Sequence, residues 1–181
     1  MRLGRGFSLL IGGARSGKSD AAVRLGLAWP GDVVFVATAS AGDADMEQRI
    51  ARHQDERPDD WALVEAPLCS ANDVDIPDGN ALLLIDCITM LVANLMFAQR
   101  SEDEIDAHMV MLADALANRS GGPSLVITNE VGLGVHPETQ MGREYRDILG
   151  RANRRLAERA ETSLFIAAGR ALPLQELEFG W

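Results

Sequence analysis

The chain has 181 residues, of which 47% are hydrophobic and 24% charged, and its formal net charge is −10 at pH 7. This is the composition of an ordinary globular protein, and we expect one domain over residues 1–181. The acidic balance argues against a nucleic-acid partner, because no basic field would steer one. No segment approaches the roughly 20 apolar residues of a membrane span.

Two features of the sequence indicate the cellular compartment of the protein. No signal peptide is visible, because the apolar run after Arg5 is too short for one. Cys69 and Cys87 have neither CxxC spacing nor a secretory context. We therefore expect reduced thiols in a cytoplasmic protein.

The first motif along the chain is a phosphate-binding loop at residues 12–19, where GGARSGKS fits the spacing G-x-x-x-x-G-K-[ST]. The apolar run 7–11 before it predicts a buried strand, and residues 17–27 predict a helix. A glycine-rich turn that carries Lys-Ser by chance is the alternative. Strand, loop and helix in this order are the context that the motif requires, and they favour the phosphate site.

In such a loop, glycines let successive backbone N–H groups point at an anion, and the helix N-terminus adds positive potential. Lys18 can reach the β- and γ-phosphates of a nucleoside triphosphate, and the Ser19 hydroxyl can ligate Mg²⁺. We expect Lys18 to be catalytic. The expected nucleotide contacts in the loop are Gly12, Gly13, Ala14, Arg15, Ser16, Gly17, Lys18 and Ser19.

Strand-like and helical segments alternate along the rest of the chain. This order predicts an α/β fold of the P-loop NTPase kind, with a mostly parallel central sheet flanked by helices. Further strands are expected at 33–37, 61–65 (at an edge), 81–86, 124–128 and 164–168. Further helices are expected around Met46–His53, at 89–98, after a capping box at 101–104, and at 139–160. Residues 67–79 are predicted to form a loop, and 173–181 a tail.

Two acids follow predicted strands at the edge where open α/β sheets bind ligands. Asp86 closes an apolar strand, the position of the acid that holds Mg²⁺ through water in P-loop enzymes. Its alternative role is to cap the helix at Thr89. Glu130 ends the neighbouring strand, and a capping or loop-closing role is as well supported by the sequence as a metal role.

His53 follows Met46 and Ile50 on one helical face and is flanked by arginines at 49, 52 and 57. A neutral imidazole can attack an α-phosphorus, and guanidinium groups would stabilise the transferring phosphate and lower the imidazole pKa. A lone histidine on an apolar helix face is more often a core residue. The residues alone leave both interpretations open.

Together these segments resemble the bifunctional cobinamide kinase/cobinamide-phosphate guanylyltransferase family of cobalamin biosynthesis. The matching segments are GGARSGKS at 12–19, VAT at 36–38, Met46–Pro58 with its Arg-Ile-x-x-His core, Trp61 with Glu65, DCIT at 86–89, TNEVGLG at 128–134 and RDILGRAN at 146–153. The resemblance runs from Leu9 to about Pro173 and keeps the family's order of motifs.

The resemblance implies a two-step enzyme. The family phosphorylates the aminopropanol hydroxyl of adenosylcobinamide with ATP or GTP, and then passes GMP from GTP through a histidine to the cobinamide phosphate. That histidine matches His53. Guanine-nucleotide contacts match Ala37, Thr38, Ala39, Gln54, Asp55, Glu56, Arg57, Glu65 and Asp86, and the metal ligands would be Ser19 and Asp86.

The resemblance also implies a homo-oligomer, of the trimeric kind, with the corrinoid as small-molecule partner. Some family members have Glu at the position of Asp86, so direct and water-mediated metal binding both stay open. Two other functions fit the phosphate loop alone: a small-molecule kinase without nucleotidyl transfer, and a nucleotide-switched binding protein.

Overall fold

The computed structural model describes residues 3–39, 58–74 and 80–175. Within these ranges the chain forms one sheet in the order β3-β2-β4-β5-β1-β6-β7. All neighbouring strands are parallel except β6 and β7, which are antiparallel. The strands are β1 (Phe7–Gly12), β2 (Val33–Ala37), β3 (Ala62–Glu65), β4 (Leu82–Asp86), β5 (Ser124–Asn129), β6 (Thr162–Ala167) and β7 (Arg170–Leu174).

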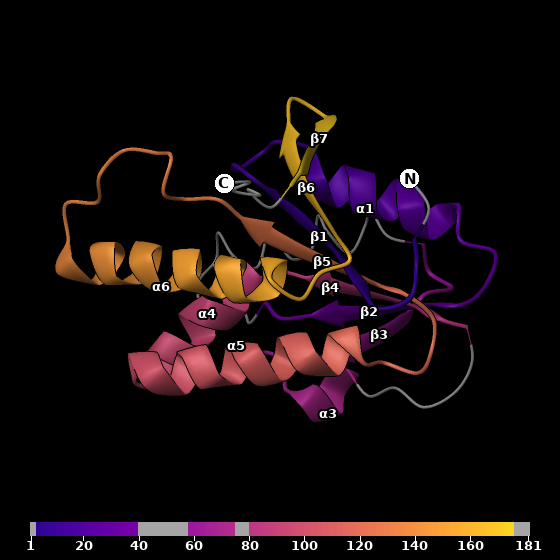
Figure 1. Ribbon diagram of the computed structural model, residues 1–181, viewed down its shortest axis with the longest axis horizontal. Helices are drawn as coiled ribbons and strands as arrows, with labels where there is room; N and C mark the ends of the chain where they lie inside the picture. The colour runs from indigo at the N-terminus through magenta and orange to yellow at the C-terminus, as the bar shows by residue number, and fades with distance from the viewer. Residues whose placement is uncertain (1–2, 40–57, 75–79, 176–181) are drawn as a thin grey trace, which may run out of the picture.

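Helices cover both faces of the sheet (Figure 1). They are α1 (Lys18–Leu27), α3 (Ala71–Val74), α4 (Ile88–Phe97), α5 (Glu102–Ala117) and α6 (Gln140–Ala157). Alternate strand residues enter two apolar cores, because successive side chains of a strand point to opposite faces. Leu84 and Ile127 pack in the core on the α1 side, whereas Ile85 and Val126 pack with α4, α5 and α6. The central strands are therefore buried on both faces, as their continuous apolar sequences predict.

The mostly parallel α/β fold is confirmed, and so are the predicted strands, with boundaries that shift by one or two residues. The edge position expected for 61–65 is confirmed, because β3 is the first strand of the sheet. The capping box is also confirmed: the Glu104 N–H donates to Ser101 Oγ, and the Ser101 N–H donates to the Glu104 carboxylate. No helix in the described part of the chain is both long and apolar enough to cross a membrane.

The structure corrects two predictions. The loop expected at 67–79 contains the short helix α3, which begins after Ser70, whose N–H and hydroxyl both donate to Asp73. The first two residues of the tail expected at 173–181 belong instead to β7, whose residues are all exposed, so its sequence shows no alternation of buried and exposed positions. Its hairpin turn is made by Ala168 and Gly169, both at positive φ. Residues 176–181 lie outside the described part of the chain. The helix expected around Met46–His53 lies outside the described residues.

Candidate functional site

The phosphate loop joins β1 to α1 in the middle of the sheet, and its close packing explains two of its glycines. A Cβ on Gly12 would collide with the backbone oxygen of Ile166 in β6. Gly17 precedes α1 with φ of 93°, a left-handed conformation that favours glycine. The Gly169 N–H donates to the Ser16 carbonyl at 2.8 Å, so the β6–β7 turn lies against the loop. The loop is held from the side by the last two strands.

Lys18 is the only lysine in the sequence, and its side chain is almost entirely buried. Its ammonium donates to the Gly13 carbonyl at 2.6 Å and to Ser16 Oγ at 3.3 Å. Burial lowers the pKa of this ammonium, while Cys87 and Asp86 nearby act in the opposite direction. A buried cation whose hydrogen bonds go to neutral oxygens is free to gain an anionic partner, such as a phosphate.

Ser19 and Asp86 form a pair of oxygen donors beside the loop. The Ser19 hydroxyl donates to Asp86 Oδ2 at 3.3 Å, across the gap between α1 and β4. A hydroxyl and a carboxylate are ligands that Mg²⁺ takes in such sites, where phosphate oxygens and water complete the octahedron. The described residues offer no cluster of three or more His, Cys, Asp and Glu side chains for a metal. The hydroxyl and carboxylate of Ser19 and Asp86 fit a Mg²⁺ ion delivered with a nucleotide.

Strand register brings several of the predicted contacts into one row. Glu65, Ala37 and Asp86 end β3, β2 and β4, and they are aligned as direct neighbours across these strands. Alternation puts Ala37 and Asp86 on the α1 face, two residues after Phe35 and Leu84 of the α1-side core. This row runs from the exposed edge of the sheet inward to Asp86, whose carboxylate accepts the hydrogen bond from Ser19 at the end of the phosphate loop, and it could lie along a nucleotide.

Thr38 is fully buried and ties two strand ends together. Its hydroxyl donates to the Cys87 carbonyl at 2.7 Å and accepts from the Cys87 N–H at 2.8 Å. The Asn94 side chain donates to the Thr38 carbonyl at 2.8 Å. In this conformation the Thr38 hydroxyl fixes the end of β2 against the start of α4. Ala39 follows it at the same edge of the sheet.

The contacts of Asp86 and Glu130 bear differently on the capping and loop-closing roles considered for these two acids. Helix α4 has Cys87, not Asp86, as its N-cap residue, so the capping role considered for Asp86 is wrong. Glu130 Oε1 accepts a hydrogen bond from the Gly132 N–H at 2.5 Å, which matches the loop-closing role. His53, Gln54, Asp55, Glu56 and Arg57 lie outside the described residues.

One buried polar side chain near this edge was not assigned from the sequence. Asn153 of α6 is 5% exposed, accepts a hydrogen bond from Thr128 Oγ1 at 2.7 Å and donates to the Asn129 carbonyl at 2.9 Å. Asn153 follows Ala152 within the apolar stripe of its helix. A polar amide among these apolar residues was the only feature of the sequence that could have indicated a structural role for Asn153. It anchors the end of β5 to α6.

A phosphate loop after the first strand, with an acid at the end of a nearby strand, defines a P-loop nucleotide-binding protein. Solved structures agree on this fold. One solved ATPase domain aligns with a TM-score of 0.52 at 12% identity, covering 91% of this chain and 70% of the other. An ATPase from the type III secretion system of pathogenic bacteria aligns with a TM-score of 0.53 at 11% identity, covering 93% and 56%.

Sequence comparison identifies the particular family. Residues 8–174 match the family described as cobinamide kinase / cobinamide phosphate guanyltransferase. The chain is 37% identical to the bifunctional adenosylcobalamin biosynthesis protein CobP of Pseudomonas aeruginosa, covering 92% of this chain and 96% of the relative. It is 36% identical to CobU of Salmonella typhimurium, covering 89% and 95%. The chain belongs to this enzyme family.

Proposed function

We propose that this enzyme phosphorylates the aminopropanol hydroxyl of adenosylcobinamide, with ATP or GTP as the donor. The substrate oxygen attacks the γ-phosphorus, the bond to the β-phosphate oxygen breaks, and the hydroxyl proton leaves to solvent or a base. Lys18 neutralises charge on the β- and γ-phosphates, and the loop N–H groups orient them. Mg²⁺ held at Ser19 and Asp86 would supply further charge neutralisation when bound.

We propose a second activity in which His53 attacks the α-phosphorus of GTP. A nitrogen–phosphorus bond forms and pyrophosphate leaves; the phosphate oxygen of cobinamide phosphate then displaces His53 and gives adenosylcobinamide-GDP. The family match and the family's name support this pair of reactions. The guanosine contacts we propose are Ala37–Ala39, Gln54–Arg57, Glu65 and Asp86, in addition to the phosphate loop.

The observation that carries the proposal is the buried Lys18 beside the Ser19–Asp86 pair, because it is a site for a triphosphate with its metal. A single experiment tests both steps. The full chain is incubated with GTP labelled at the α- or γ-phosphate, with and without cobinamide, and the His53 peptide is analysed by mass spectrometry. We expect γ-label on cobinamide and acid-labile α-label on His53.

The same experiment separates the alternatives. A plain kinase transfers only γ-label and keeps full activity in His53→Asn, whereas a nucleotide-switched binding protein hydrolyses GTP slowly and labels neither target. If His53→Asn still accumulates α-label on the protein, another residue is the nucleophile. His108→Asn is the matched control, because His108 hydrogen-bonds to the Cys69 carbonyl in the α3–α5 region.

We also propose that the chain acts as one cytoplasmic catalytic domain over residues 1–181, assembled as a homotrimer. Light scattering on the purified chain measures this assembly directly. A monomer at working concentrations that retains both activities would contradict the trimer as the functional unit.

A further inference from the structure

The last residue of β5, Asn129, lies next to the phosphate loop, and none of the roles above uses its side chain. Strand β5 lies between β1, which carries the loop, and β4, which carries Asp86. Asn129 is aligned with Gly12, the first residue of the loop. It is therefore placed between the phosphate loop and the proposed metal ligand.

The alternation of β5 decides which way this residue faces. Leu125 and Ile127 pack in the core on the α1 side, whereas Val126 packs on the opposite face and the Thr128 side chain reaches α6. Asn129 is four residues after Leu125 and two after Ile127, and alternate residues of a strand share a face. Its side chain is therefore on the α1 face of the sheet, as that of Asp86 is. This is the face from which Lys18 and Ser19 approach.

The backbone of Asn129 is fixed on both sides by side chains from two helices. Its N–H donates to Thr89 Oγ1 at 2.8 Å, and its carbonyl accepts from Asn153 Nδ2 at 2.9 Å. The Tyr145 hydroxyl of α6 donates to the Thr89 carbonyl at 3.2 Å, which links the two anchors. Among the described residues, no partner takes the Asn129 carboxamide itself. The bonds from Thr89 and Asn153 thus hold the backbone of Asn129 and do not use its carboxamide.

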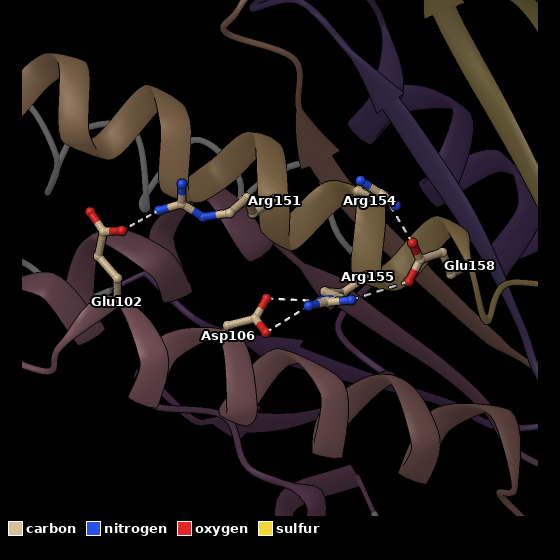
Figure 2. A network of polar contacts seen from close by, with 6 residues as sticks. All are labelled: Glu102, Asp106, Arg151, Arg154, Arg155 and Glu158. Carbon is tan, nitrogen blue, oxygen red and sulfur yellow. Dashed lines mark hydrogen bonds and ion pairs between the residues drawn. The ribbon is translucent and has the colours of Figure 1, made fainter.

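Helix α6 is itself held in place along α5. Figure 2 shows Arg151 paired with Glu102, and Arg155 paired with Asp106 through two hydrogen bonds of 2.8 and 2.9 Å. The helix that anchors Asn129 is therefore fixed to the rest of the molecule outside the site.

We propose that the Asn129 carboxamide donates a hydrogen bond to the γ-phosphate of the bound triphosphate and is a catalytic residue of the phosphoryl transfer. An amide donor suits this place because it stabilises charge on the transferring group without adding a charge of its own. The inference rests on the proposed function for its reaction. Its binding component can be measured without any corrinoid.

The test compares wild type with Asn129→Ala and Asn129→Asp in the full chain. Calorimetry measures the affinity for GDP and for the non-hydrolysable triphosphate GMPPNP, each with Mg²⁺. We expect Asn129→Ala to bind GMPPNP about tenfold more weakly with GDP binding unchanged, because one hydrogen bond to a charged group is lost. Asn129→Asp should bind GMPPNP more weakly still, because it places a carboxylate against the γ-phosphate.

Turnover gives the second readout. Transfer of γ-label to cobinamide should fall about 100-fold in kcat in Asn129→Ala, the effect of removing one donor to a developing charge. Asn118→Ala is the matched control, because Asn118 is an exposed amide at the far end of α5.

Equal losses for GDP and GMPPNP would indicate a structural role and overturn the proposal, as would unchanged GMPPNP affinity and kcat. If wild type transfers no label to cobinamide, the proposed function fails. The GDP–GMPPNP comparison still decides the role of Asn129 in that case.

Discussion

The phosphate-loop edge of the sheet and the seam between α5 and α6 are both rich in charged groups, yet they use charge differently. At the seam, arginines of α6 and of the turn after it meet acids of α5 in pairs, and these side chains are substantially exposed. At the loop, one buried ammonium bonds to neutral oxygens, and a carboxylate faces a hydroxyl.

The difference indicates where function resides. Exposed ion pairs add little to stability because water screens them and ordering long side chains costs entropy. A buried and incompletely compensated charge costs free energy in the absence of its ligand, and ligand binding recovers that cost. The seam fixes two helices, whereas the loop is built for a ligand, although the seam contains more charges.

The largest effect is expected at Lys18. Lys18→Met should lower nucleotide-dependent turnover by about 10³-fold, because the cation proposed to bind the β- and γ-phosphates is lost. The ligand-free variant should melt at the same temperature as wild type or higher, because the desolvated ammonium is removed. Thermal melts and steady-state kinetics measure both effects.

Arg24→Met is the control for Lys18, because Arg24 is an exposed cation further along α1. Because Lys18 is the only lysine, an amine-directed reagent provides an independent check by mass spectrometry. Nucleotide should protect the Lys18 peptide. A clear loss of stability in ligand-free Lys18→Met would mean that this lysine is structural, like the seam charges.

Asp86 should show the next largest effect. Asp86→Asn should lower activity about 100-fold and shift the magnesium dependence to higher concentrations, since the proposed metal ligand loses its charge. Asp60→Asn is the control, because Asp60 is exposed and precedes β3, at the amino end of the strand. It should leave the activity and the magnesium dependence unchanged. A magnesium titration of turnover is the measurement. An unshifted magnesium dependence in Asp86→Asn would argue against metal binding there.

Two adjacent glycines distinguish packing from ligand binding within the loop. Gly12→Ala should reduce the free energy of unfolding by about 2 kcal/mol, because its Cβ meets the Ile166 carbonyl. Gly13→Ala should leave stability unchanged, because nothing lies within 4 Å of its Cβ. Urea denaturation of the ligand-free variants measures this. Equal stability of the two would show that the loop relaxes away from β6.

The seam should respond weakly. Arg155→Ala breaks the bidentate pair with Asp106 and should lower Tm by about 2 °C or less, with no change in turnover. The effect should shrink in about 1 M salt because the charges are screened. Arg154→Ala is the control, because Arg154 pairs with Glu158 at the end of its own helix. A loss of turnover in Arg155→Ala would mean that the ion pairs of the seam affect the geometry of the site through α6.

The smallest effect concerns the capping box of α5. The Ser101 N–H lowers the pKa of Glu104 below its ordinary value of 4.5. A lowered folded-state pKa stabilises the protein above the unfolded value, and this contribution is lost as the pH falls below about 4.5. Glu104→Gln should therefore flatten the acid side of the Tm–pH profile. An unchanged profile would show that Glu104 does not contribute to the acid dependence.

Local sequence was sufficient for most elements and for part of the site. The apolar strand, glycine loop and helix at 7–27 predicted the phosphate loop, because backbone conformation and short-range spacing decide that motif. The Ser101–Glu104 box predicted its helix start for the same reason. The sequence placed both Asp86 and Glu130 at strand ends, but their side chains bond to Ser19 and Gly132 respectively, and no local pattern specifies these partners.

What tertiary structure alone decided lies in strand order and register. The sequence did not show that β5 lies between β1 and β4, so it could not place Asn129 opposite Gly12. Nor did it show that Asn153 anchors that strand end, or that the β6–β7 turn supports the loop at Ser16. These contacts join residues far apart in the chain, and their partners are chosen by packing of the whole sheet. Local propensity determines the loop, whereas long-range pairing determines what surrounds it.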